Sequence, residues 1–213
     1  YLLHRAPHWT LAECRAAFGW NLDQWLYFGG YPGAAALVAD EVQWRAYVRD
    51  SLIEPAIGRD VMALHTVGKP ALLRQLFGAA CRTPAQVVAY AKLLGQLIDA
   101  GNTSTLAHYL ELLATAHLCS GLDKFAQGQP GLRGSSPKLI VWNNALVSAV
   151  VGRSQAAVHA DPSWRGRLVE NAVGAHLLQQ LAPLGWQVQW WRDGNDEVDF
   201  VLRGPDGAVW AID

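Results

Sequence analysis

The sequence has few charged residues and no long hydrophobic run. Charged side chains make up 16% of its 213 residues, with 17 basic residues against 18 acidic ones and a formal net charge of −1. This balance lacks the basic excess of a dedicated nucleic-acid-binding protein. The longest apolar stretch, residues 139–151, is interrupted by Asn143 and Asn144, so we expect no membrane-spanning helix.

Cysteine pairs and familiar catalytic motifs are missing. Cys14, Cys81 and Cys119 lie far apart and form no CxxC motif, which excludes a zinc knuckle recognisable in the sequence and predicts a reducing, cytoplasmic setting. No HExxH or GxSxG motif occurs. His4 and His8 have a ligand-like spacing, but their place near the start of the chain favours surface residues over metal ligands.

The sequence also lacks a P-loop. The glycine-rich segment 29–33 has no lysine after it, and Gly68-Lys69 is followed by Pro70 instead of Ser or Thr. We therefore expect no ATP site within these residues. The sequence opens at Tyr1 without a methionine or a signal-peptide pattern, from which we expect a piece of a longer protein.

What is present predicts an α+β protein with helices first and strands last. Helical periodicity over residues 11–18 and from residue 34 to about 62, with a turn at 29–33, predicts a helical, lid-like region over residues 1–66. Ten tryptophans and the low charge predict a weakly polar surface or one covered by a partner.

Residues 67–151 have the pattern of a winged helix. Three helical segments, 71–80, 84–98 and 103–119, follow in close succession, the last with Thr103, Ser104 and Thr105 supplying its N-cap. A glycine-rich stretch at 128–136 resembles a wing, and a strand from residue 138 to 142 and a short helix over 145–151 follow.

Two interpretations of this region compete. The helix after Thr103 offers His108 and Glu111 but no basic residue, which favours a packing module over a sequence-specific DNA reader. The alternative is weak, salt-sensitive phosphate contact at the wing through Lys124, Arg133 and Lys138.

The C-terminal third, residues 152–213, predicts a helix followed by an antiparallel sheet. A polar connection at 152–163 marks the domain boundary, an apolar helix is expected over 167–181, and strands over 186–192, 197–203 and 208–213. The loop 205–207 suits a type I turn with glycine in the left-handed position, which sets Leu202 opposite Trp210 and Phe200 opposite Ile212. The same register sets Asp199 opposite Asp213.

Facing carboxylates on neighbouring strands require a cation between them or solvent around them. A divalent magnesium or manganese ion, held by Asp199 and Asp213, is the first option, and a solvated rim position is the alternative. Glu170, the one acid of the expected helix, either joins this site or pairs with Arg167 three residues earlier.

A helix with a glutamate followed by three strands with acids resembles the PD-(D/E)xK nuclease-like core. By this resemblance Glu170, Asp199 and Asp213 are the catalytic acids that hold Mg²⁺ or Mn²⁺. The lysine that follows the last acid in that superfamily would lie after Asp213, where the sequence stops, and the final helix and strand of that core are missing from it, so the domain is expected to be incomplete at its C-terminal end.

A broader resemblance covers most of the chain. Its motifs are those of the uncharacterised region that follows the ATPase module in bacterial and archaeal AAA-type ATPases: Gly29–Gly33, Arg59-Asp60, 102–113, 135–139, VENAVGAHL around Glu170, Trp191-Arg192 and 197–201. The resemblance implies an upstream ATPase domain as a partner in the same polypeptide, with ATP bound only there. Arg59 could reach a neighbouring subunit's nucleotide, but an ordinary surface role is favoured.

Three hypotheses of function follow. The first is a substrate- or nucleic-acid-handling C-terminal portion of an AAA-type ATPase without its own nucleotide site. The second is Mg²⁺-dependent phosphodiester cleavage, and the third is a non-catalytic protein-interaction scaffold, which the near-neutral charge favours over the second. Enzymatic activity and the oligomeric state, including a homo-oligomer, stay open.

Overall fold

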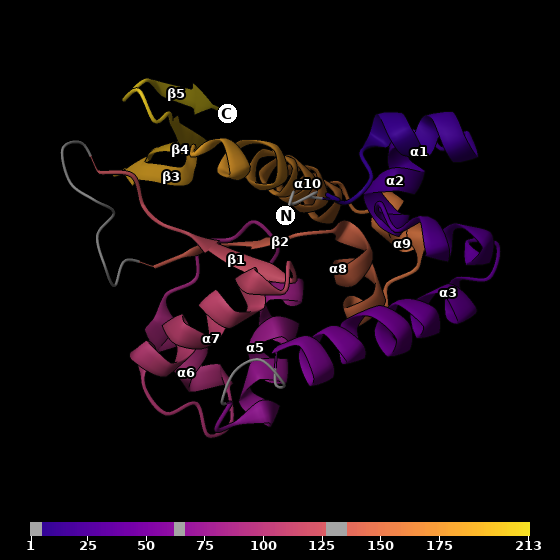
Figure 1. Ribbon diagram of the computed structural model, residues 1–213, viewed down its shortest axis with the longest axis horizontal. Helices are drawn as coiled ribbons and strands as arrows, with labels where there is room; N and C mark the ends of the chain where they lie inside the picture. The colour runs from indigo at the N-terminus through magenta and orange to yellow at the C-terminus, as the bar shows by residue number, and fades with distance from the viewer. Residues whose placement is uncertain (1–5, 62–66, 127–135) are drawn as a thin grey trace, which may run out of the picture.

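The computed structural model describes residues 6–61, 67–126 and 136–213, and it is a mixed α+β structure, as expected (Figure 1). Two small antiparallel sheets are present in these residues, β1-β2 and β3-β4-β5. No helix in the described ranges is both long and apolar enough to cross a membrane. The expected wing at 128–136 falls almost entirely on residues outside the described ranges.

The N-terminal helices α1 (Leu11–Phe18) and α2 (Leu22–Phe28) begin at capping boxes. Thr10 with Glu13, and Asn21 with Gln24, satisfy free backbone N–H groups at the two N-termini. The chain turns after α2 as predicted, but Gly29 is required there by close packing. An added Cβ at Gly29 would lie 2.6 Å from the backbone nitrogen of Ala145.

The single long helix expected from residue 34 is instead divided. A 3-10 helix, η1 (Pro32–Leu37), comes first, and α3 (Glu41–Tyr47) begins only after Asp40, whose carboxylate accepts from the N–H groups of Val42 and Gln43. Two π-helical segments follow, η2 (Val48–Ile53) and η3 (Ala56–Val61). Arg59 lies exposed in η3.

His8 is only partly exposed, because it packs against the chain around Trp142. Its ring is half-buried, with Nδ1 3.1 Å from the carbonyl oxygen of Trp142, and its backbone N–H donates to Gln179 at 3.0 Å. Burial lowers the pKa of His8, so the neutral imidazole is favoured. His4 lies outside the described residues.

The middle of the chain contains α5 (Pro70–Arg82), α6 (Tyr90–Gln96) and α7 (Thr103–Thr115). The predicted helix over 84–98 is shorter because the chain turns at Ala85, which has a φ of 58°, and residues 85–88 bond to Pro137 and to β2. The Ala85 N–H donates to the Leu139 carbonyl at 2.8 Å. The N-cap of α7 is Asn102, not one of the three hydroxyl residues after it. Leu106, Leu110 and Leu113 are buried on α7.

The strands β1 (Cys119–Leu122) and β2 (Lys138–Val141) form the first sheet, and α8 (Asn144–Val151) and α9 (Gln155–His159) follow. The expected polar connection thus contains a short helix. All four residues of β2 are buried. Alternate residues contribute to different cores: Leu139 and Val141 to the larger one, and Ile140 to the smaller one.

Helix α10 (Pro162–Leu181) begins five residues earlier than predicted, because Asp161 caps it and Pro162 is its first residue. A 3-10 turn, η4 (Ala182–Leu184), leads to β3 (Gln187–Asp193), β4 (Asp196–Arg203) and β5 (Val209–Ile212). The predicted pairing of β4 with β5 is confirmed, with Leu202 opposite Trp210 and Phe200 opposite Ile212.

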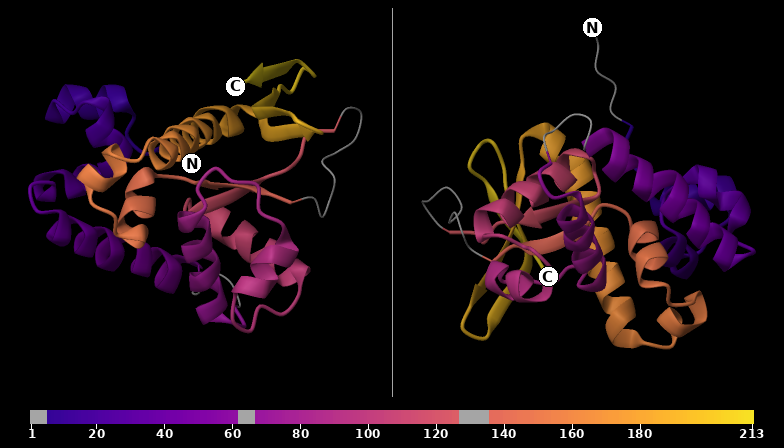
Figure 2. Two further views of the ribbon diagram at one scale, coloured as in Figure 1. Left: turned by 180° about the vertical axis from the view of Figure 1, so that it is seen from behind. Right: turned by 90° about the horizontal axis from the view of Figure 1, so that it is seen from below.

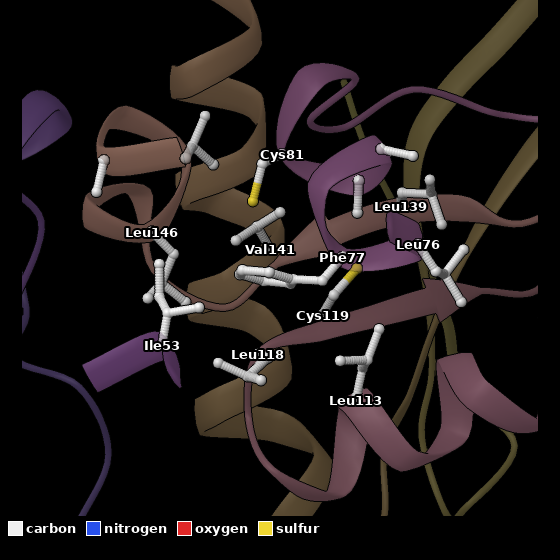
Figure 3. Close-up of a cluster of buried hydrophobic side chains, with 14 of the residues drawn as sticks. Ile53, Leu76, Phe77, Cys81, Leu113, Leu118, Cys119, Leu139, Val141 and Leu146 are labelled. Atoms are coloured by element: carbon white, nitrogen blue, oxygen red, sulfur yellow. The ribbon is translucent and has the colours of Figure 1, made fainter. Parts of the chain in front are cut away.

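The β1-β2 sheet lies between two helical layers. Figures 1 and 2 show α10 on one side of it and the helices α5, α6 and α7 on the other. On the α5 side, Phe77, Cys81 and Cys119 meet Leu139 and Val141 in the larger core (Figure 3). On the other side, Gly174 allows α10 to approach closely, because an added Cβ would lie 2.8 Å from both Ile140 and Phe200.

Candidate site around a buried lysine

Lys138 is the first residue of β2, and it is buried although it is charged. Only 1% of its surface is exposed. Its neighbours in β2 fill the two cores, and the pairing of β2 with β1 and with Val87 fixes the backbone on both sides. The side chain therefore extends between α10 and β4, where a buried ammonium requires negative partners.

Two carboxylates supply those partners. Asp199 in β4 accepts from Lys138 Nζ through Oδ1 at 2.7 Å and through its backbone carbonyl at 3.1 Å, and Glu170 in α10 forms an ion pair with the same ammonium. The Phe200 ring lies 4.8 Å from Nζ, which adds a cation–π contact. The Glu170 and Asp199 side chains keep 21% and 33% of their surface exposed.

The protonation of Glu170 is shifted toward neutral pH. Burial raises the pKa of Glu170 to about 7, the Lys138 ammonium opposes that rise, and the neighbouring Asp199 carboxylate adds to it. The carboxyl of Glu170 therefore exchanges a proton near neutrality, with two acids and one base sharing a confined space.

The structure bears on three expectations about these residues. Lys138 does not contact phosphate at a wing, because its ammonium is buried between two carboxylates. Glu170 lies in the middle of α10 and pairs with Lys138, not with Arg167. Asp213 follows the end of β5 and is exposed, and among the described residues it forms no metal-holding group with Glu170 and Asp199.

The arrangement fits a bound divalent ion poorly. Within the described ranges, no three side chains of histidine, cysteine, aspartate or glutamate gather closely enough to hold a metal ion. The position that a cation would take beside Glu170 and Asp199 is taken by Lys138 Nζ, and an ammonium group has no lone pair to offer a metal. The Lys138 ammonium thus already supplies the positive charge beside the two carboxylates.

The residues after β1 join the C-terminal sheet. Lys124 forms a parallel bridge with Trp190 in β3, Phe125 N–H donates to the Trp190 carbonyl at 2.7 Å, and Trp190 N–H donates to Asp123 at 3.1 Å. The Lys124 ammonium lies 5.9 Å from the Trp190 ring. Lys124 is thus tied to β3, and Arg133, the remaining predicted phosphate contact, lies outside the described residues.

A buried asparagine network holds β2 and α10 together, and the sequence analysis missed it. Asn171, fully buried, accepts from Val141 N–H at 2.9 Å and donates to the Val141 carbonyl at 2.8 Å and to Asn144 at 2.9 Å. Asn144 in turn donates to the carbonyls of Leu26 and Leu168. The signal was a polar residue within an otherwise apolar helix, directly after Glu170.

These features define an α+β protein built around an internal ion cluster, and comparison with known families places it. A family model described as a domain of unknown function (DUF8612) matches residues 19–157, and the chain belongs to this family. A second model, a domain of unknown function (DUF4143), matches residues 165–213. Comparisons with curated proteins and with solved structures return no match.

Proposed function

We propose that this chain is a non-catalytic, protein-contacting portion of an AAA-type ATPase, in which the acid pair serves structure and not phosphodiester chemistry. The observation that carries the proposal is the burial of Lys138 between Glu170 and Asp199. A catalytic lysine must reach the substrate phosphate, and this ammonium is covered by the chain itself. The ATPase partner rests on the sequence resemblance.

The contacts of the residues just before the expected wing support contact with protein over contact with nucleic acid. The order of α5, the extended segment at Val87, α6, α7, β1 and β2 supports the winged-helix interpretation. Residues 123–125, which precede the expected wing at 128–136, bond to β3, however, and α7 has no lysine or arginine. A reader of DNA needs free cationic groups at both places.

The exposed apolar residues of β5 also favour a protein partner. Val209 and Trp210 are 51% and 63% exposed. Trp210 is on the same side of the sheet as Leu202, which is buried, so the apolar face of the sheet continues past the part that α10 covers. Exposed aromatic residues are characteristic of protein interfaces.

Magnesium-dependent phosphodiester cleavage is the second candidate. The convergence of Glu170 and Asp199, both partly exposed, favours it, since this is how the resembling nuclease core holds its metal. It requires a metal to bind while Lys138 occupies the space between the acids, and the donor set described above does not offer that arrangement.

Metal titration separates the two candidates. Calorimetric titration of the chain with Mn²⁺ and with Mg²⁺, combined with cleavage assays on single- and double-stranded DNA, should give no saturable binding and no cleavage. The Lys138→Ala variant should gain Mn²⁺ affinity, because it leaves two uncompensated carboxylates. Saturable Mn²⁺ binding by the unmodified chain that is lost in Asp199→Ala, together with cleavage, would establish the nuclease instead.

A further inference from the structure

A cavity of about 320 Å³ opens between the N-terminal helices and the start of α10, away from Lys138. It is lined by two carboxylates, a guanidinium, an imidazole, a carboxamide and three apolar side chains, which come from α2, α3, α9 and α10. Its volume lies at the lower end of the range for small-molecule sites. Which of its polar groups are still uncommitted decides what it can bind.

The first carboxylate, Asp23, is fully engaged. Its Oδ1 accepts from Arg165 Nε at 2.9 Å and lies 2.8 Å from Arg165 Nη2. Its Oδ2 lies 3.5 Å from His159 Nδ1. Asp23 is therefore neutralised by Arg165, with His159 adding positive charge when it is protonated.

The second carboxylate, Glu41, is engaged in the same way. It accepts from the Tyr27 hydroxyl at 2.9 Å and from the Gln155 backbone N–H at 3.2 and 3.3 Å. Arg45 Nη1 lies 3.5 Å from the same carboxylate and compensates its charge. Neither acid is left with an unpaired charge to attract a cationic ligand.

Donors, in contrast, remain available. Within the described part of the chain, Arg165 Nη1 and the Gln155 carboxamide form no hydrogen bond. Arg165 keeps 37% of its side chain exposed. Leu26 and Val158, both buried, supply an apolar wall beside these donors. The cavity thus offers free hydrogen-bond donors next to hydrocarbon surface, although the charge of Arg165 is shared with Asp23.

We infer that this cavity binds a small organic carboxylate, held by Arg165 and Gln155 with its hydrocarbon part against Leu26 and Val158. A carboxylate supplies acceptors for these free donors, and the side of the Arg165 guanidinium that Asp23 does not use matches its geometry. The site is independent of the proposed function and of the Lys138 cluster. Its lining joins helices of the two matched regions, residues 19–157 and 165–213, so ligand binding should stabilise their contact.

Butyrate is a suitable probe, with butyramide as the uncharged match. At constant ionic strength, sodium butyrate should shift the NMR signal of Arg165 Nε–H saturably and raise the melting temperature of the full chain, whereas butyramide should do neither. Arg165→Met should weaken butyrate binding by about tenfold or more, as expected for loss of a charge-assisted hydrogen bond.

Two further variants guard against a folding defect. Gln155→Ala keeps the Asp23–Arg165 ion pair and should still weaken butyrate binding severalfold. Arg153→Met is the matched control, because Arg153 pairs with Asp161 at 2.9 Å and does not line the cavity. The affinity of this variant for butyrate should be unchanged. Absence of a saturable shift by about 50 mM butyrate, equal shifts with butyramide, or equal loss in Gln155→Ala and Arg153→Met would each overturn the assignment.

Discussion

Lys138 and Lys69 each form an ion pair with an aspartate at similar distance, yet one pair is buried and the other is solvated. Lys138 is 1% exposed and lies 2.7 Å from Asp199, whereas Lys69 is 39% exposed and lies 2.6 Å from an Asp99 that is 73% exposed. Water screens the second pair and not the first. The contribution of a lysine to the unfolding free energy of this protein therefore depends on whether its ammonium group is buried.

The Lys138→Met variant should lose about 3–5 kcal/mol of unfolding free energy, because it leaves Glu170 and Asp199 facing each other without a counter-charge. Lys69→Met, the solvated match, should lose less than about 1 kcal/mol. Urea unfolding followed by tryptophan fluorescence measures both. A Lys138→Met loss as small as that of Lys69→Met would contradict the assigned role of the ion cluster.

Glu170 should make stability depend on pH near neutrality. Burial raises the pKa of Glu170 from 4.5 to about 7, so between these values the folded state binds more protons than the unfolded state. The unfolding free energy should therefore fall as pH rises from about 4.5 to 7, with a contribution from Glu170 of at most about 3 kcal/mol.

Comparing Glu170→Gln with a surface control isolates this contribution. Glu170→Gln should flatten the dependence of unfolding free energy on pH in that interval, while Glu111→Gln, at an 80% exposed side chain, should leave it unchanged. Urea titrations at several pH values provide the measurement. An unaltered slope in Glu170→Gln would show that the carboxyl does not titrate as described.

At the scale of elements, the turn after α2 depends on a glycine for two separate reasons. Gly29 has φ +67° and ψ −157°, a conformation that is essentially restricted to glycine, and an added Cβ would also meet Asn143 and Ala145. Gly152, at the end of α8, has φ +75° but open space around its Cα. Comparing Gly29 with Gly152 therefore separates the cost of the backbone conformation from the cost of a steric clash.

Gly29→Ala should lower the unfolding free energy by about 3 kcal/mol or more, since the backbone of α8 cannot move away without losing its own packing. Gly152→Ala should cost only about 1–2 kcal/mol, the penalty of the left-handed conformation. Thermal unfolding of both variants beside the unmodified chain tests this. Similar losses would mean that the close approach of α2 and α8 is adaptable.

Local signals in the sequence were sufficient for many elements of this fold. The hairpin of β4 and β5 was predicted with its register, because Pro205, Asp206 and Gly207 determine the loop and alternation determines the faces. The helices α1, α7 and α8 were found from periodicity within a few residues of their bounds. Each of these signals lies within about ten residues of the element that it predicts.

The site could be predicted only in part, because its cation comes from a distant segment. Glu170 and Asp199 were identified from a helix and a strand that are neighbours in sequence. Lys138 lies 61 residues before Asp199, and nothing in its surroundings distinguished a buried lysine from a solvent-exposed one at the edge of a wing. The bonding of residues 85–86 to β2 was missed for the same reason, since their partner is the distant Leu139.

At the scale of the whole molecule, β2 joins the two cores. Leu139 and Val141 belong to the core that extends from Cys14 to Leu168, and Ile140 belongs to the core completed by Phe200 and Leu202. The Asn171 network and the Lys138 cluster tie the same strand to α10 and β4. The regions matched by the two family models are therefore expected to unfold together.

Urea unfolding should consequently show a single transition, with the same midpoint by far-ultraviolet and near-ultraviolet circular dichroism. Ile140→Ala and Val141→Ala leave cavities in different cores. Each should nevertheless lower the one midpoint, with a loss of unfolding free energy of about 2 kcal/mol or more, and should not split the transition. A separate early transition in Ile140→Ala alone would indicate that residues 165–213 unfold on their own.

The positive charge beside Glu170 and Asp199 is carried by a side chain. It is therefore part of the polypeptide and is present once in every chain, whatever ions surround it. We therefore expect this region to be insensitive to the supply of divalent ions. Treatment with a chelator such as EDTA, or addition of millimolar magnesium, should leave the melting temperature of the chain where it was, and differential scanning calorimetry would reveal any departure.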